Sequence, residues 1–269
     1  MSTADKEALA RFEFPGLASE KDPDVLVTGS GDATTALLSL LSKTEGGQDA
    51  EYIRWHLFDH LPEQYRVSGV RNGQRWVSTP ACRAARLAQS PPFDVADLMV
   101  QYLFAEPAGE ALRAFSALGV ALTTHGRRPA LVQERIGTFC YDIVERLANS
   151  RGVLGAHVLP WYPSIGVFLT IDTCETGDHA ARSEALKELV ETEGVVGAWR
   201  YVGTQRKLGA YVSDPKQSAT VYYLYDDPVA VAGRLKDGIE RDWRRSNAEG
   251  LFAAPFYVAQ PHDIERYLP

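Results

Sequence analysis

The chain has few cysteines, no long apolar run and no excess of positive charge, and each shortage excludes a class of protein. Its three cysteines, Cys82, Cys140 and Cys174, are far apart and not in CxxC spacing, so neither a disulfide framework nor a zinc knuckle is expected. No apolar stretch approaches the roughly 20 residues of a membrane helix. The N-terminus lacks the basic and apolar segments of a secretory signal. We therefore expect a cytoplasmic protein with no membrane partner.

The charge balance argues against nucleic acid as a partner. The chain has 28 basic and 35 acidic residues, for a net charge of −7, and no Lys/Arg cluster. A phosphate backbone needs a positive surface, which this composition does not provide. A hydrophobic content of 45% over 269 residues is enough for a full core.

The order of predicted elements repeats once along the chain. Residues 1–22 are polar and are predicted to form an N-terminal arm. The first half, 23–150, has predicted strands over 24–28, 70–78, 98–104 and 135–144, and predicted helices over 33–41, 49–65 and 108–122. The second half, 151–269, has predicted strands over 164–172, 196–202, 220–225 and 251–258, and predicted helices over 180–192 and 227–244. Each half therefore reads βαββαβ.

This order predicts an α+β fold made of two ferredoxin-like halves. The βαββαβ unit places both helices on one face of a four-stranded antiparallel sheet and leaves the other face bare. A bare apolar face has to be buried. Two such faces from one chain can pack sheet to sheet, which predicts an intrachain α+β barrel with its helices outside.

The most informative segment is the predicted helix over 49–65. His56 and His60 lie four residues apart, about one turn, so their side chains share a face, with Glu63 three residues further along. Asp59 is about one turn from both His56 and Glu63. Pro62 interrupts the hydrogen-bond ladder just after His60, which predicts a kinked helix end that directs an imidazole into a cavity.

Trp55, followed by His60-Leu61-Pro62-Glu63, a glycine and a strand, resembles the signature of EthD-like proteins, a family of the dimeric α+β barrel superfamily. The chain departs from the family pattern at His56, where a tyrosine is common. Its second half has no His-Leu-Pro. With the repeated element order, the resemblance indicates a tandem duplication with one pocket, in the first half.

The resemblance implies chemistry without a cofactor on an apolar small molecule. Among the side chains of the helix over 49–65, an imidazole is best matched to proton transfer near neutral pH. We predict a lyase, dehydratase or isomerase of the cyclase kind, with His60 as the main acid/base, His56 as second choice, and Asp59 or Glu63 as orienting groups. A cofactorless monooxygenase acting on a phenol and a non-catalytic ligand-binding barrel remain alternatives.

A metal site is a less favoured interpretation of the same helix. His56, His60 and Glu63 have facial ligand spacing but lack the HExxH glutamate placement and a clear third imidazole, so no metal is expected.

Aromatic residues on alternating strand positions predict the wall of the pocket. Their rings would suit an aromatic or polyketide-like substrate, and the alternative is that they only fill the core. The predicted substrate-binding residues are Trp55, Trp76, Tyr102, Phe104, Tyr141, Tyr223 and Tyr225. An exposed helix or strand edge leaves room for a homodimer.

Overall fold

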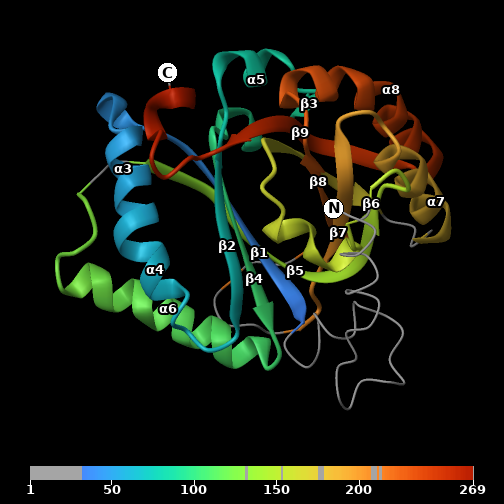
Figure 1. Ribbon diagram of the computed structural model, residues 1–269. Coiled ribbons are helices and arrows are strands. Elements are labelled where there is room, and N and C mark those ends of the chain that lie inside the picture. Colours follow the sequence, from blue (N-terminus) through green and yellow to red (C-terminus); the bar gives the residue numbers. More distant parts are fainter. Residues whose placement is uncertain are drawn as a thin grey trace, which may run out of the picture. The chain divides into compact units, whose positions relative to one another are not determined.

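An antiparallel sheet of nine strands is the frame of the structure (Figure 1). The structure is a computed structural model that describes residues 32–130, 133–152, 154–174, 179–206, 211 and 214–268. The predicted arm over 1–22 and the predicted strand over 24–28 lie outside the described residues. The fold below is that of the unit Gly31–Pro269.

The strands of the described residues are β1 (Ala33–Thr44), β2 (Val70–Val77), β3 (Ala88–Gln89), β4 (Leu98–Ala105), β5 (Gln133–Ala148), β6 (Gly166–Cys174), β7 (Val195–Gly203), β8 (Gln217–Leu224) and β9 (Ala248–Val258). The α-helices and the π-helical turn η3 are, in chain order, α3 (Asp49–Trp55), η3 (His56–His60), α4 (Leu61–Gln64), α5 (Pro80–Ala84), α6 (Ala108–Thr124), α7 (His179–Val190) and α8 (Pro228–Ser246). Short helical turns are η2 (Glu45–Gly47), η4 (Phe93–Val95), η5 (Ala156–Trp161) and η6 (Ile264–Tyr267).

The strand pairings form a closed ring. The order is β2-β4-β1-β5-β7-β8-β6-β9-β3, and β2 also pairs with β9 through Trp76 opposite Val258 and Val77 opposite Tyr257. Every strand except β3 therefore belongs to a closed ring of pairings. Since each pairing is antiparallel, one set of alternate side chains from all of these strands points into the ring.

Large apolar side chains from both halves fill the inside of the ring. Trp76, Tyr141, Trp199, Tyr223 and Phe252 are fully buried there and belong to one cluster. The opposite set of side chains faces the helices. Helices α4 and α6 cover the outer face of β1, β2 and β4, while α7 and α8 cover that of β6, β7 and β8 (Figure 1).

The predicted helix over 33–41 is wrong, because this segment is the central strand β1. β1 lies between β4 and β5, with Ala36 and Leu38 inside the ring and Leu37 under the helices. A strand buried on both faces has an apolar residue at almost every position and loses the alternation that marks a strand. The other predicted elements within the described residues are present, with boundaries displaced by a few residues.

The helix predicted over 49–65 is present as α3, η3 and α4 in succession. Pro62 has no N–H, and its ring crowds the carbonyl of Phe58. The ladder widens just before it, where the Leu61 N–H bonds to the carbonyl oxygen of His56, five residues back. This π-helical turn contains both histidines, and π turns occur often at functional sites.

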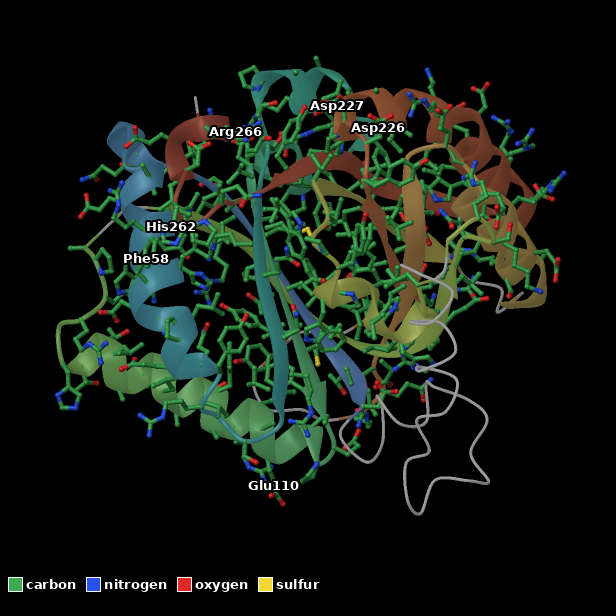
Figure 2. The ribbon with its side chains drawn as sticks, in the orientation of Figure 1. Phe58, Glu110, Asp226, Asp227, His262 and Arg266 are labelled. Atoms are coloured by element: carbon green, nitrogen blue, oxygen red, sulfur yellow. The ribbon has the colours of Figure 1, made fainter. Side chains whose placement is uncertain are left out.

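The C-terminal segment of the chain packs against the helix that carries the histidines. Ile264 belongs to the same apolar cluster as Tyr52 and Ile53 of α3. Figure 2 shows His262 beside Phe58 of η3, with ring centroids 5.8 Å apart. The helix is thus packed between the sheet and the end of the chain. Among the described helices, none has the length and apolar character of a membrane span.

Two glycines in left-handed conformation connect a helix to the strand that follows it in each half. Gly69 has φ +91° and Gly194 has φ +96°, a region that L-residues with a side chain rarely adopt. A Cβ atom added to Gly69 would lie 2.7 Å from the Cβ of Ala111 on α6. Gly69 therefore allows α6 to approach the start of β2.

We expect Gly69→Ala to lower the free energy of unfolding by about 1–3 kcal/mol, since alanine is strained at this φ and clashes with α6. Gly233, an exposed residue in α8 with open space around it, is the matched control. Gly233→Ala should raise the free energy of unfolding by about 0.5–1 kcal/mol. Urea denaturation measures both, and equal effects of the two variants would contradict the assignment of Gly69.

Candidate functional site

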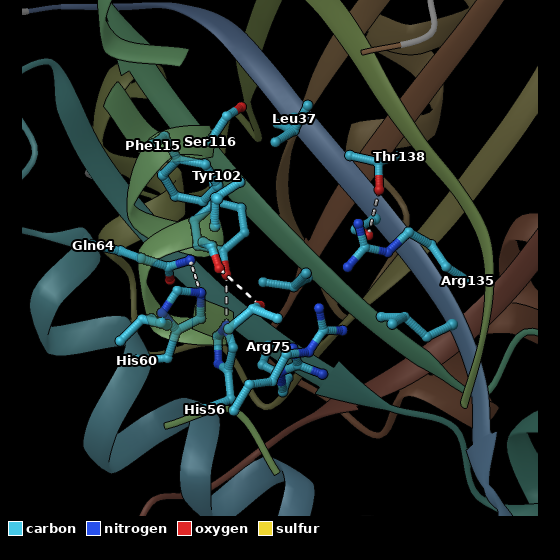
Figure 3. Close-up of a pocket in the computed structure, with 18 of the residues that line it drawn as sticks. Leu37, His56, His60, Gln64, Arg75, Tyr102, Phe115, Ser116, Arg135 and Thr138 are labelled. Carbon is cyan, nitrogen blue, oxygen red and sulfur yellow. Dashed lines mark hydrogen bonds between the residues drawn. The ribbon is translucent and has the colours of Figure 1, made fainter. Parts of the chain in front are cut away.

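A cavity of about 690 Å³ lies between the outer face of the sheet and the helices of the first half (Figure 3). Its floor comes from β1, β2, β4 and β5, and its sides from α3, η3, α4 and α6. Tyr52, Trp55, Tyr102, Phe115 and Tyr211 supply aromatic surface. The volume lies within the range of about 300–1,000 Å³ that small-molecule sites occupy.

His56 is the more deeply buried of the two histidines, with 2% of its surface exposed. Its Nε2 lies 2.6 Å from the hydroxyl oxygen of Tyr102, while its Nδ1 has no hydrogen-bond partner. Burial lowers the pKa of His56 well below its usual value, and Arg75 and His60 lower it further. His56 is therefore neutral near pH 7 and fixed by the phenol.

His60 lies at the cavity wall with one face of its ring covered. The Trp55 ring is stacked on it, with centroids 5.0 Å apart and an angle of 15°. Its Nε2 lies 2.7 Å from the side-chain nitrogen of Gln64, one turn further along, and its Nδ1 has no partner. Burial lowers the pKa of His60 to about 4, although Glu63 and Asp59 act in the opposite direction. His60 is therefore a neutral imidazole whose hydrogen-bond partner is Gln64 of the same helix.

Tyr102 is a neutral phenol. Its burial raises the pKa well above the usual value, against the opposing effects of Arg75 and a hydrogen bond from Gln64. The hydroxyl therefore keeps its proton and shares a hydrogen bond with His56. Gln64 contacts both Tyr102 and His60, so these polar groups form one connected set along the cavity wall (Figure 3).

The charged residues in the lining are all positive. Arg75 is 2% exposed, lies 4.8 Å above the Tyr52 ring, and has a distant contact of 3.4 Å from Nη2 to the Tyr52 hydroxyl. Its Nε and Nη1 have no partner. Arg128 and Arg135 are exposed at the edge of the cavity. Although the whole chain carries a net charge of −7, this cavity is suited to an anionic ligand.

Asp59 and Glu63 do not line the cavity. Both carboxylates bind Arg127, with one oxygen of each 2.6 Å from a guanidinium nitrogen. They affect the charge of His60 from a distance, and the orienting contact with an imidazole that we predicted is not formed. The described residues contain no group of three or more His, Cys, Asp or Glu side chains placed to hold a metal ion.

The predicted aromatic residues separate into four places. Trp55 and Tyr102 line the cavity together with His56 and His60. Phe104 is buried edge-on against Phe115, behind the cavity wall. Three of the others, Trp76, Tyr141 and Tyr223, lie inside the closed ring, and Tyr225 is 43% exposed. The structure does not bring these four to the cavity.

Gln64, Arg75 and Phe115 are among the lining residues that the sequence analysis missed. Gln64 lies one turn after His60 and could have been found by helical spacing. Arg75 interrupts the apolar end of β2, just before Trp76 and Val77, and a charge at that position is a detectable signal. Phe115 had no signal, because only the packing of α6 places it beside Tyr102.

The lowered pKa values of the two histidines predict a pH-dependent stability. In the unfolded chain His60 is protonated below about pH 6.5, whereas in the folded chain it is protonated only below about pH 4. The folded state therefore loses stability as the pH falls from 6.5 to 4. For one imidazole the slope is at most about 1.4 kcal/mol per pH unit, and solvent screening at half-buried His60 reduces it.

We expect His60→Asn to flatten the urea-derived stability curve between pH 6.5 and 4, because asparagine takes up no proton in either state. His262→Asn, at an exposed position, serves as the control. A His60→Asn curve parallel to that of the unmodified chain would rule out the low pKa.

The comparisons with known proteins give a fold and no family. No family model and no curated protein matches the chain. Among solved structures, a protein assigned as a chlorite dismutase is 12% identical, with a TM-score of 0.54, covering 88% of this chain and 100% of its own. A dye-decolorizing peroxidase from Bacteroides thetaiotaomicron is 6% identical, with a TM-score of 0.56, covering 88% and 96%. A chlorite dismutase from Candidatus Nitrospira defluvii is 14% identical, with a TM-score of 0.50, covering 92% and 100%.

These likenesses confirm the predicted ferredoxin-like α+β fold, and the EthD-like family is not shown. They also overturn the predicted function. The three solved structures named above are of chlorite dismutases and a dye-decolorizing peroxidase, and none is of a lyase, dehydratase or isomerase, so the prediction of a cofactor-independent lyase, dehydratase or isomerase is wrong. The alternative prediction, a cofactorless monooxygenase acting on a phenol, is not proposed either.

Proposed function

We propose that the cavity of the first half binds a planar anionic tetrapyrrole, with haem as the leading candidate, and that the chain is an oxidoreductase of this cofactor class. The observation that carries the proposal is His60, a neutral imidazole at the wall of a cavity of about 690 Å³ between aromatic rings and cationic side chains. The similarity of the fold to chlorite dismutases and a dye-decolorizing peroxidase supports the choice of cofactor.

The residues present fit an iron porphyrin in three respects. An imidazole has to be neutral to donate a lone pair to a metal, and the pKa of about 4 keeps His60 neutral. Apolar and aromatic walls match a flat macrocycle. Arg128 and Arg135 at the cavity edge match the carboxylates that a haem carries on one side.

His60 is the better ligand of the two histidines. The Nε2 of His56 is held by the buried Tyr102 hydroxyl at 2.6 Å, and releasing it would leave a buried phenol without a partner. The Nε2 of His60 contacts only Gln64, whose side chain can rotate away without moving the backbone. The stacked Trp55 ring limits rotation of His60 and so orients its imidazole.

A bound iron porphyrin would supply one-electron and oxygen chemistry. The residues of the chain would then bind and orient it. His60 would hold the iron, Arg128 and Arg135 would hold the carboxylates, and the apolar floor from Leu37 and Val100 would exclude water. His56 and Tyr102 retain a hydrogen bond that can keep a proton beside the ligand.

We further infer that the chain is a tandem of two ferredoxin-like halves, over 23–150 and 151–269, that close one barrel through the pairing of β2 with β9. An aromatic or polyketide-like compound remains a proposed substrate class, because the aromatic lining suits it. The EthD-like relationship and a homodimer also remain proposals, and their support is the Trp55 to Glu63 motif and the exposed outer helices.

Titration of the purified chain with haemin tests the proposal by absorbance. We expect the Soret band to shift and saturate at one haemin per chain, with a spectrum typical of an imidazole ligand. His60→Ala should abolish this spectrum, and His56→Ala should weaken binding while leaving the coordination spectrum unchanged. His262→Ala, which removes an exposed histidine, is the control. An unchanged spectrum in His60→Ala, or no shift in the unmodified chain, would refute the proposal.

A further inference from the structure

The two halves place an arginine at the same register of corresponding strands. Arg75 lies six residues after the left-handed Gly69, and Arg200 lies six residues after the left-handed Gly194. Both arginines are buried, with 2% and 6% of their surface exposed. Their neighbours in sequence, Trp76 on β2 and Trp199 on β7, point into the closed ring, so both guanidinium groups lie on the side of the helices.

In the second half the chain supplies the counterions. Arg200 pairs with Glu145, its neighbour across the β5–β7 pairing, at 2.8 Å. Beside it, Arg182 of α7 binds both oxygens of Asp172 at 2.8 Å. These side chains fill the space between sheet and helices, where the remaining hollow measures about 10 Å³.

In the first half the corresponding counterion is missing. The residue beside Arg75 on the β9 side is Ala259, whose N–H donates to the Arg75 carbonyl oxygen at 2.9 Å. No described carboxylate lies within ion-pair distance of the Arg75 guanidinium, and its Nε and Nη1 have no partner. Here the space between sheet and helices is the cavity of about 690 Å³.

A buried guanidinium without a carboxylate is costly, because it keeps its charge in proteins, and the contacts of Arg75 with the hydroxyl and ring of Tyr52 repay only part of the lost hydration. The same cost is avoided at Arg200 by a carboxylate. We infer that Arg75 binds a carboxylate carried by the ligand of this cavity, an inference that rests on the cavity being the binding site proposed above. The ligand class is thus an organic acid with a flat apolar body, and its carboxylate lies at the end of the cavity formed by Tyr52 and His56.

Haemin and haemin dimethyl ester are the first pair of probes, because the ester keeps the macrocycle and removes both carboxylate charges. We expect the unmodified chain to bind haemin at least about tenfold more tightly than the ester, as a charge-assisted hydrogen bond predicts. In Arg75→Met the ratio of the two affinities should fall by about tenfold, and any preference that remains is due to Arg128 and Arg135 at the cavity edge. Arg71→Gln, at an exposed position of the same strand, should keep the full discrimination.

The thermal midpoint of the ligand-free variants separates binding from folding. Arg75→Met replaces an unpaired buried charge by an apolar side chain of similar length, so its midpoint should equal or exceed that of the unmodified chain. A lower midpoint would indicate that Arg75 has a structural role, and would contradict the inference.

Failure of the proposed function is distinguishable from failure of this inference. If neither porphyrin binds, haem is wrong, and Arg75 is then tested by thermal shift with 2-naphthoate against methyl 2-naphthoate. Greater stabilisation by the acid that disappears in Arg75→Met would support the inference. Equal binding of acid and ester to the unmodified chain, for either pair of probes, would overturn it.

Discussion

Both faces of the sheet have to be covered, and the way in which each face is covered decides where a ligand can bind. The inner face is covered by closure of the strand ring, and the rings of Trp76, Tyr141, Trp199 and Tyr223 fill the space that closure creates. None of these four rings lines the cavity that the described residues form. The outer face is covered by helices, and helices can be held away from a sheet by the side chains between them. The cavity therefore lies outside the ring, under α3, η3, α4 and α6.

The two outer faces differ because their charges are balanced differently. In the second half, Glu145 and Asp172 neutralise Arg200 and Arg182, and the helices close over a filled space. In the first half the buried charge of Arg75 has no internal counterion, and the polar groups of His56, Tyr102, Gln64 and His60 connect only to each other. A set of this kind is complete only when a ligand contributes the missing groups. The half without this internal charge balance is the half that contains the cavity.

The helix above the cavity shows how a local irregularity serves the site. Pro62 prevents regular α-helical bonding, and the ladder widens into a π-helical turn at the two histidines. The widened turn places the rings of His56 and His60 edge to face, with centroids 5.8 Å apart. Trp55 covers one imidazole and Tyr102 bonds the other, so the two have different environments although they lie four residues apart.

Local patterns in the sequence determined most of the elements and one part of the site. The helix of His56 and His60, the strands β2 and β4, and the repeated order of elements follow from short-range periodicity, which requires no knowledge of the fold. β1 could not be predicted correctly, because burial on both faces is a property of its neighbours and erases its alternation. The same reason separates Tyr102, which lines the cavity, from Tyr223, which fills the ring: both lie on similar strands, and only closure decides which face is interior. Arg75 is the clearest case. The sequence places an arginine near the end of a strand, but only the tertiary structure shows that Ala259 lies where a carboxylate would be needed.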